Sequence, residues 1–145
     1  MLTIEKETDT DVTQFLLENI LLLAIILVCI CVLSAPYVMK RRFGTQVDNT
    51  QATQLINHKG AQIVDLRDPK EFKKEALANS INIPADRIQY EFERLKKDKP
   101  VLLVDNNGRH ARLASPLLRG LGFKETYILQ GGLDAWRRAG LPFTR

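Results

Sequence analysis

The chain has 145 residues, of which 45% are hydrophobic and 26% are charged. That length allows one domain of ordinary size, and that composition excludes a mainly disordered or fibrous chain. The net charge of +4 conceals an asymmetry, because residues 1–39 carry one base and five acids whereas residues 40–145 carry 20 bases and 12 acids. Two physically different regions are therefore joined in one chain.

Both cysteines, Cys29 and Cys31, lie in the first of these regions. Two positions apart on a helix, they point in different directions and are expected to be apolar filler. No cysteine follows residue 31. The second region therefore has neither a disulfide framework nor a mechanism that uses a cysteine of its own.

The first predicted element is a membrane-spanning helix over residues 19–39, preceded by a short acidic N-terminus over residues 1–18. The span contains 21 consecutive residues without a charge. At about 1.5 Å per helical residue, this length covers a hydrocarbon core of roughly 30 Å. The flank before the span is acidic and three bases follow it, which argues against a cleaved secretory signal. We predict a retained single-pass helix.

The charges on either side of the span predict its orientation. Lys40, Arg41 and Arg42 follow it at once, whereas only Lys6 precedes it. The positive-inside bias therefore predicts that the C-terminal part lies in the cytoplasm and the N-terminus outside the plasma membrane. The basic triplet opens a linker over residues 40–48 and is expected to approach anionic lipid, although a stop signal for insertion is its simpler role.

After the linker, the pattern alternates between helices and strands. Short apolar runs bounded by turn residues predict strands, and apolar residues at helical spacing predict helices. Strands are expected over residues 61–66, 80–84, 100–105 and 127–129, and helices over 50–58 (capped by Asn49 or Thr50), from 68–69 onward, 86–97, 109–121 and 132–139. Strands separated by helices predict right-handed crossovers and a mostly parallel sheet covered on both faces, in a domain over residues 49–145.

The most promising place for chemistry is the loop between the apolar strand at 100–105 and the long helix after it. In open α/β sheets, ligands bind where the carboxyl ends of strands meet helix N-termini. The amides and the glycine of this loop suit a tight curl that aims several backbone N–H groups at an anion. An ordinary strand-to-helix turn explains the same residues equally well. The loop consists of Asp105, Asn106, Asn107, Gly108, Arg109 and His110.

Six stretches of the second region stand in a characteristic order and spacing: Val64–Phe72, Ile81–Pro84, Val101–Gly108, Gly120–Phe123, Ile128–Trp136 and Ala139–Pro142. On these stretches, residues 47–145 resemble a rhodanese homology domain. The resemblance implies a five-stranded parallel sheet flanked by helices. With the apolar helix in front, the chain is similar to membrane-anchored, single-domain rhodanese-like proteins of Gram-negative bacteria, which implies the inner membrane as its location.

The departures from the family pattern fall on the positions where the family does chemistry. Active members carry a nucleophilic cysteine, which takes up sulfane sulfur as a persulfide, on the first residue of the loop, and the resemblance places Asp105 there. A carboxylate cannot form a persulfide, and its charge repels thiosulfate. The family's loop arginine falls on His110, beside Arg109, and its Gly-His pair falls on Glu75 and Ala76.

For the charged residues near the strand ends, a structural role is a simpler expectation than a chemical one. Asp105 is expected to accept backbone N–H groups and stiffen the loop, and Asp65 with Arg67 is expected to form an ion pair that fixes a strand-to-helix turn. As candidate contacts for a ligand, we name Arg67, Asp65, Arg109 and His110. A sharper alternative makes Asp105 an acceptor of phosphate, which needs a metal ion or further acids nearby, and Asp65 is the nearest.

The remaining expectations concern cofactors, partners and overall function. No cofactor is expected, two histidines without a cysteine in the domain argue against a metal site, and dispersed bases without interleaved aromatics argue against nucleic acid. The sequence therefore predicts a membrane-anchored, catalytically inactive rhodanese-like domain that acts as a binding or regulatory module at the cytoplasmic face of the inner membrane. Its expected partner is a membrane protein, or a peptide that carries an anionic group or a thiol.

Two alternatives of another class stay open. One is a sulfurtransferase or sulfur carrier that uses the thiol of a partner. The other is a phosphoryl-transfer enzyme or hydrolase based on Asp105.

Overall fold

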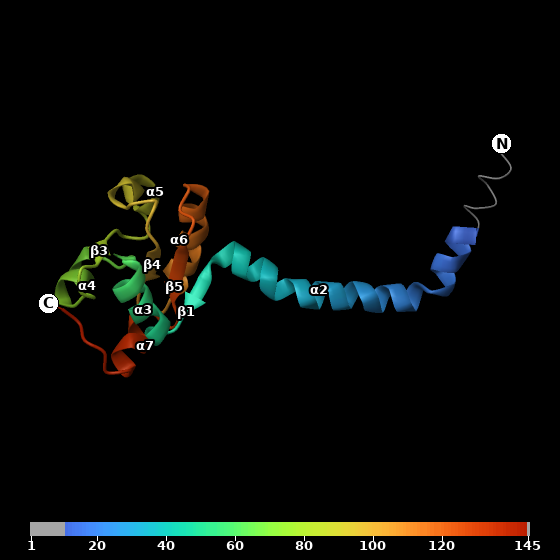
Figure 1. Ribbon diagram of the computed structural model, residues 1–145, viewed down its shortest axis with the longest axis horizontal. Coiled ribbons are helices and arrows are strands. Elements are labelled where there is room, and N and C mark those ends of the chain that lie inside the picture. Colours follow the sequence, from blue (N-terminus) through green and yellow to red (C-terminus); the bar gives the residue numbers. More distant parts are fainter. Residues whose placement is uncertain (1–10, 145) are drawn as a thin grey trace. The chain divides into compact units, whose positions relative to one another are not determined.

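The computed structural model describes residues 11–144, and for residues 40–42 it describes the backbone alone. The chain divides into two compact units, Met1–Met39 and Lys40–Arg145. The described part of the first unit is helical, and the strands of the described chain all lie in the second unit (Figure 1).

The apolar segment forms the helix α2, which runs over Ile20–Phe43. Its part Ile20–Met39 is long and apolar enough to cross a membrane. The helix does not end near residue 39, as the sequence suggested, but continues through the three bases to Phe43. Lysine and arginine are good helix formers, and cations are favoured at a helix C-terminus, so the basic triplet extends the helix instead of ending it.

The second unit is built on one five-stranded parallel sheet, in the order β1-β5-β4-β2-β3 (Figure 1). This confirms the predicted fold class. Between the strands the chain crosses over through helices, as parallel pairing requires. The strands are β1 (Thr45–Val47), β2 (Gln62–Asp65), β3 (Ile81–Asn82), β4 (Val101–Val104) and β5 (Thr126–Leu129).

The edge strand β1 occupies part of the stretch that the sequence assigned to a linker. Its register pairs Thr45 with Tyr127 and Val47 with Leu129 of β5. Just before it, Gly44 lies against the side chain of Ser115, where an added Cβ would stand 2.3 Å from the Ser115 Oγ. The chain therefore enters the domain by close packing and ladder pairing, not through a free spacer.

Helix α3 (Asn49–Lys59) begins one residue earlier than predicted, because its cap is Asp48. The Asp48 carboxylate accepts the backbone N–H of Gln51 at 2.7 Å, and the Gln51 side chain accepts the Asp48 N–H at 3.3 Å. This reciprocal pair is a capping box, which satisfies two backbone donors at once. The helix ends at Gly60 in the left-handed conformation.

Replacing Asp48 with alanine is expected to lower the free energy of unfolding by about 1 kcal/mol, because an N-terminal donor of α3 loses its partner. Urea unfolding of the full chain in detergent, followed by the fluorescence of the single tryptophan Trp136, measures this change. Thr50→Ala on the exposed side of the same turn is the control and is expected to be neutral. An equal loss in both variants would contradict the assignment of the cap.

The predicted helix over 86–97 is instead a short helix, α5 (Ile88–Glu91), followed by a 3₁₀ turn over Phe92–Arg94. The side chain of Gln62 explains the early end. It donates to the backbone oxygen of Lys96 and accepts the backbone N–H of Lys96, both at 2.8 Å. A helix continuing through Lys96 would use that N–H internally, so the bond to β2 and the longer helix exclude each other.

The remaining helices are α4 (Pro69–Lys74), α6 (Arg109–Gly120) and α7 (Gly132–Arg138). Two apolar cores lie on the two faces of the sheet. One contains the buried side chains of α5 and α6, and the other contains those of α3 and α7. Strand β4 serves both, because Val101 and Leu103 point into the first core and Leu102 and Val104 into the second. All four are fully buried, as expected for a central parallel strand.

Candidate functional site

The loop that the sequence singled out follows β4 and leads into α6. Asp105 comes directly after the strand and is 1% exposed, and Gly108 takes the left-handed conformation at the N-cap of α6 with φ of +87°. Glycine is favoured there because a side chain strains the backbone in this conformation. The turn therefore curls tightly under the N-terminus of α6.

The carboxylate of Asp105 lies inside this curl. It accepts the backbone N–H of Gly108 at 2.5 Å through Oδ1 and the backbone N–H of His110 at 2.8 Å through Oδ2. The expected hydrogen bonds from backbone N–H groups of the loop to Asp105 are thereby confirmed. The N–H of Arg109, between these two, donates to the Asn107 side chain at 3.0 Å. Three consecutive donors at this helix start are thus bound by side-chain oxygens of the loop itself, which satisfies groups that would otherwise bind an external anion.

The two basic side chains of the loop point outward. The His110 side chain is 61% exposed, although its Nδ1 lies 3.3 Å from the Asp105 Oδ2. Arg109 is exposed and forms no ion pair with any residue in the range 11–144. Both side chains are therefore available to a ligand or partner at the mouth of the loop.

The other two candidate contacts form the expected internal ion pair. Arg67 Nη2 donates to the Asp65 Oδ2 at 2.8 Å, and the two side chains are 4% and 0% exposed. The Arg67 Nη2 also donates to the backbone oxygen of Glu75 at 2.8 Å. The pair therefore ties the end of β2 to the end of α4. Asp65 does not reach the surface, whereas Arg67 borders a pocket.

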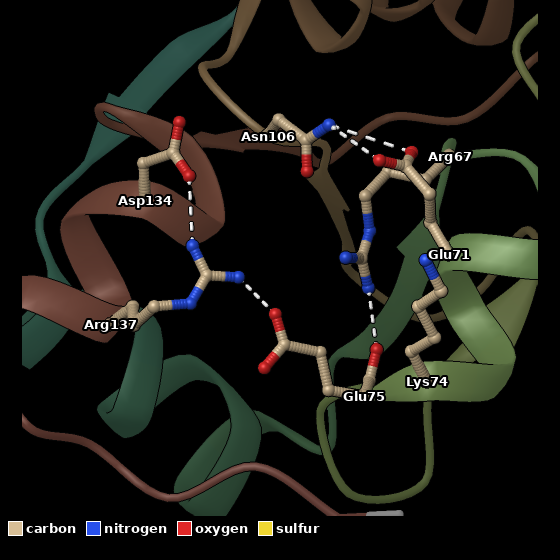
Figure 2. Close-up of a pocket in the computed structure, with 7 residues that line it drawn as sticks. All are labelled: Arg67, Glu71, Lys74, Glu75, Asn106, Asp134 and Arg137. Atoms are coloured by element: carbon tan, nitrogen blue, oxygen red, sulfur yellow. Dashed lines mark hydrogen bonds and ion pairs between the residues drawn. The ribbon is translucent and has the colours of Figure 1, made fainter.

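This pocket has a volume of about 430 Å³ and opens beside the loop. Figure 2 shows its lining side chains arranged around a central space. They come from the segments that follow three neighbouring strands, where a parallel sheet gathers its ligand contacts. The lining residues are Arg67, Glu71, Lys74, Glu75, Asn106, Asp134 and Arg137.

Contacts across the pocket join the loop to the surrounding helices. The Asn106 side-chain amide donates to the Glu71 carboxylate at 3.3 Å. Arg137 donates to Asp134 at 2.9 Å and is also paired with Glu75 (Figure 2). The hydrogen bond to Glu75 raises the pKa of Arg137 above its ordinary value, so this guanidinium stays charged.

The pocket is balanced in charge, with three bases and three acids in its lining. It is therefore not a cationic funnel for small anions. Sequence reasoning named Arg67 and Asn106 but missed the acids and bases contributed by α4 and α7. Their spacing was the available signal, because Glu71 and Lys74, like Asp134 and Arg137, stand three positions apart on a short helix that follows a strand.

The geometry also limits what Asp105 can do chemically. A nucleophilic carboxylate needs an oxygen that faces the substrate. Both oxygens of Asp105 accept backbone N–H groups, and the side chain is buried. Within residues 11–144, no three His, Cys, Asp or Glu side chains stand together so as to hold a metal ion.

A family model described as the rhodanese-like domain matches residues 48–139. The chain belongs to this family. The rhodanese-like match covers the helix α3, the strands β2 to β5 and the loop at Asp105, and it leaves out α2 and β1.

Relatives with similar sequences include two bacterial proteins. The protein YibN of Escherichia coli (strain K12) is 36% identical over 99 residues, which cover 66% of this chain and 68% of the relative. The thiosulfate sulfurtransferase GlpE of Vibrio cholerae is 32% identical over 96 residues, which cover 66% of this chain and 91% of the relative.

Solved structures show the same fold. A rhodanese-related protein from Thermoplasma volcanium superposes with a TM-score of 0.61 at 27% identity, covering 69% of this chain and 97% of that chain. The superposition therefore extends over almost the whole of that structure.

Proposed function

We propose that this protein is a catalytically inactive rhodanese-like domain that acts as a binding or regulatory module on the cytoplasmic side of the inner membrane. The observation that carries the proposal is the carboxylate of Asp105, buried in the loop and bound to the N–H groups of Gly108 and His110. At the position where active members of the family carry a reactive cysteine sulfur, this chain carries a carboxylate.

The chemistry of sulfur transfer supports this proposal. A persulfide forms on a thiolate, and the cysteine position of the family falls on Asp105 by the resemblance described above. The domain has no other cysteine to take its place, since Cys29 and Cys31 both lie in the apolar helix. The name thiosulfate sulfurtransferase belongs to the relative GlpE, and we do not extend its activity to this chain.

Electrostatics oppose thiosulfate binding in the same loop. A second anion placed about 4 Å from the Asp105 carboxylate is repelled by about 4 kcal/mol per pair of unit charges at an effective dielectric constant of about 20. The backbone donors that would offset this repulsion are already bound to side-chain oxygens of the loop. An ordinary thiosulfate complex is therefore unfavourable.

The surfaces left open suit a polar partner. Arg109 and His110 are exposed at the mouth of the loop, and the neighbouring pocket carries both signs of charge. An anionic group on a peptide segment can pair with the outward-facing bases Arg109 and His110. A basic side chain of the same peptide can pair with the acids of the pocket. We therefore propose a protein partner at the membrane, which the domain holds near the bilayer.

The membrane part of the proposal is supported by α2. Its segment Ile20–Met39 has the length and composition of a membrane span. The bases Lys40, Arg41 and Arg42 directly after it favour a cytoplasmic location for the domain, and they attract anionic lipid.

A thiosulfate:cyanide assay on the full chain in detergent tests the inactivity. With cyanide as the sulfur acceptor we expect no thiocyanate formation above a heat-denatured control, and with a small thiol as the acceptor we expect no release of sulfite from thiosulfate above the same control. Turnover with either acceptor would overturn the proposal, and turnover with the thiol alone would favour a sulfur carrier that uses a partner's thiol.

Asp105→Cys, in a chain that also carries Cys29→Ala and Cys31→Ala, tests the shape of the loop separately. After incubation with thiosulfate, a persulfide adds the mass of one sulfur atom to the intact protein. Its appearance would show that the loss of cysteine alone removed the activity. Its absence would show that His110 and Glu75 have changed the site as well.

A further inference from the structure

The outer side of α6 carries an apolar strip bordered by arginines. Among the described residues of the domain, the exposed large apolar side chains are Tyr90, Leu113 and Leu117. The two leucines are one helical turn apart on α6, and they are 62% and 46% exposed. We call the surface formed by the exposed side chains Arg109, Arg112, Leu113, Pro116 and Leu117 the α6 face.

The charge of α6 is of one sign. The helix contains three arginines and one histidine, and it contains no acid. Its opposite side is buried in the core through Ala111, Ala114, Ser115 and Leu118. A helix with an exposed apolar strip and a cationic border resembles the helices that lie at the boundary between lipid headgroups and acyl chains.

The outer side of α3, on the other face of the sheet, makes the contrast. The exposed residues of α3 are Thr50, Gln51, Thr53, Gln54, Asn57, His58 and Lys59. They are almost all polar and uncharged, and none is a large apolar residue. Of these two helices, only α6 therefore carries an exposed surface that is both apolar and cationic.

The residues that directly follow α2 contact side chains of α6. Gly44 packs on the Ser115 side chain, and the Gln46 side-chain oxygen, in its favourable orientation, accepts Arg112 Nε at 3.0 Å and Nη2 at 3.1 Å. The five residue steps from Met39 to Gly44 run mostly through the end of α2, and at the helical rise they span roughly 8 Å. The lipid headgroups occupy about 5–8 Å beyond the hydrocarbon edge, so a domain attached to a membrane span through Gly44 stays within reach of them.

We propose that the α6 face docks on the anionic headgroups of the same membrane that α2 spans. This rests on the proposed membrane anchoring. Arg109 and Arg112 bind lipid phosphates, and Leu113 and Leu117 enter the boundary between headgroups and acyl chains. The loop at Asp105 leads into the same helix, so docking brings its mouth to the level of the headgroups.

Charge favours lipid over a second copy of this chain. Two α6 faces packed against each other would bring arginines of like charge together without an acid on the helix to compensate. An anionic bilayer supplies the opposite charge over the whole surface, and its attraction extends about 8 Å at physiological ionic strength.

Lipid-dependent quenching of a fluorophore on the α6 face tests the proposal. The full chain, with Cys29→Ala and Cys31→Ala, receives Pro116→Cys labelled with a small environment-sensitive fluorophore. It is placed in nanodiscs of phosphatidylcholine alone or mixed with phosphatidylglycerol, both containing a lipid that carries a nitroxide quencher near its headgroup. The matched control is the same label at Asn57→Cys on α3, which lies on the other face of the sheet.

The label at position 116 is expected to be quenched in phosphatidylglycerol discs, whereas the label at position 57 is not. Adding Leu113→Gln and Leu117→Gln should reduce the quenching at 116 to the level of the control, and added salt should weaken it. Glutamine keeps helix propensity and both sites are exposed, so the domain remains folded. An unchanged circular dichroism spectrum verifies this.

The other outcomes overturn the proposal. Equal quenching of the labels at positions 116 and 57, or quenching at position 116 that does not depend on phosphatidylglycerol, contradicts docking on anionic lipid. Shielding of position 116 that appears in detergent without lipid and rises with protein concentration shows an interface between copies instead. Extraction of the chain from membranes by alkaline carbonate is measured in parallel: a chain that is extracted contradicts the proposed anchoring, whereas a chain that stays anchored with an unquenched 116 contradicts only the docking.

Discussion

Replacing Arg67 with methionine is expected to lower the free energy of unfolding by about 3–5 kcal/mol, because the substitution leaves a buried charge without its partner. Asp65 is 0% exposed and Arg67 is its ion-pair partner at 2.8 Å. The same guanidinium also holds the backbone oxygen of Glu75. A loss of this size is a large fraction of the stability of an ordinary domain.

Urea unfolding of the full chain in detergent measures the effect, since Trp136 is 6% exposed in the core and reports on the domain. Arg137→Met is the matched control. Arg137 is also paired with two carboxylates, but its side chain is 47% exposed, and exposed pairs contribute about 0–1 kcal/mol. If the two variants lose equal stability, burial is not what makes the Arg67 pair important.

Replacing Gly132 with alanine is the second substitution with a large expected effect. Gly132 has φ of +61°, and an added Cβ would stand 2.5 Å from the backbone oxygens of Asp105 and Asn106. Those oxygens accept the N–H groups of Leu133 and Asp134 at 2.8 and 3.0 Å, which hold the start of α7 against the loop. The backbone conformation and the forced separation together are expected to cost about 2–5 kcal/mol.

Gly140→Ala separates the two causes. Gly140 has nearly the same conformation, with φ of +69°, but no atom lies within 4 Å of its added Cβ. Its substitution is expected to cost about 1–2 kcal/mol, the cost of the left-handed conformation alone. Urea unfolding of both variants compares them directly, and equal losses would show that the contact with the loop is unimportant.

Much of the fold was predictable from the sequence because several signals agreed. The apolar run at Val101–Val104 predicted a buried central strand, and the turn at Asp68 and Pro69 predicted the start of α4. The alternation of strands and helices predicted the parallel arrangement, and motif order then supplied what the pattern alone did not, namely the number of five strands. Where local propensity, pattern and motif coincide, the sequence determines the element.

The elements that the sequence did not predict depend on distant contacts. Strand β1 is three residues long, and only pairing with β5 makes it a strand. The early end of α5 depends on the Gln62 side chain, more than 30 positions away from its partner Lys96. Such contacts leave no periodic pattern at the positions they control.

The candidate site divides in the same way. The bond pattern of Asp105 and the pairing of Asp65 with Arg67 are local and followed from residue type and spacing. The charge-balanced pocket could not be predicted in this way, because it forms only when α4 and α7 meet beside the loop. Its bridging contact between Arg137 and Glu75 joins residues that are 62 positions apart.

Mechanical force applied to α2 enters the domain through a single short strand. Thr45–Val47 pairs with β5 alone, and the backbone oxygen of Val47 accepts the N–H of Gln130 at the far end of the ladder. Pulling α2 away from the domain therefore loads these few hydrogen bonds first, while β4, β2 and β3 remain paired. Detachment of β1 would uncover the edge of β5, to which an extended segment of another chain can add as a strand.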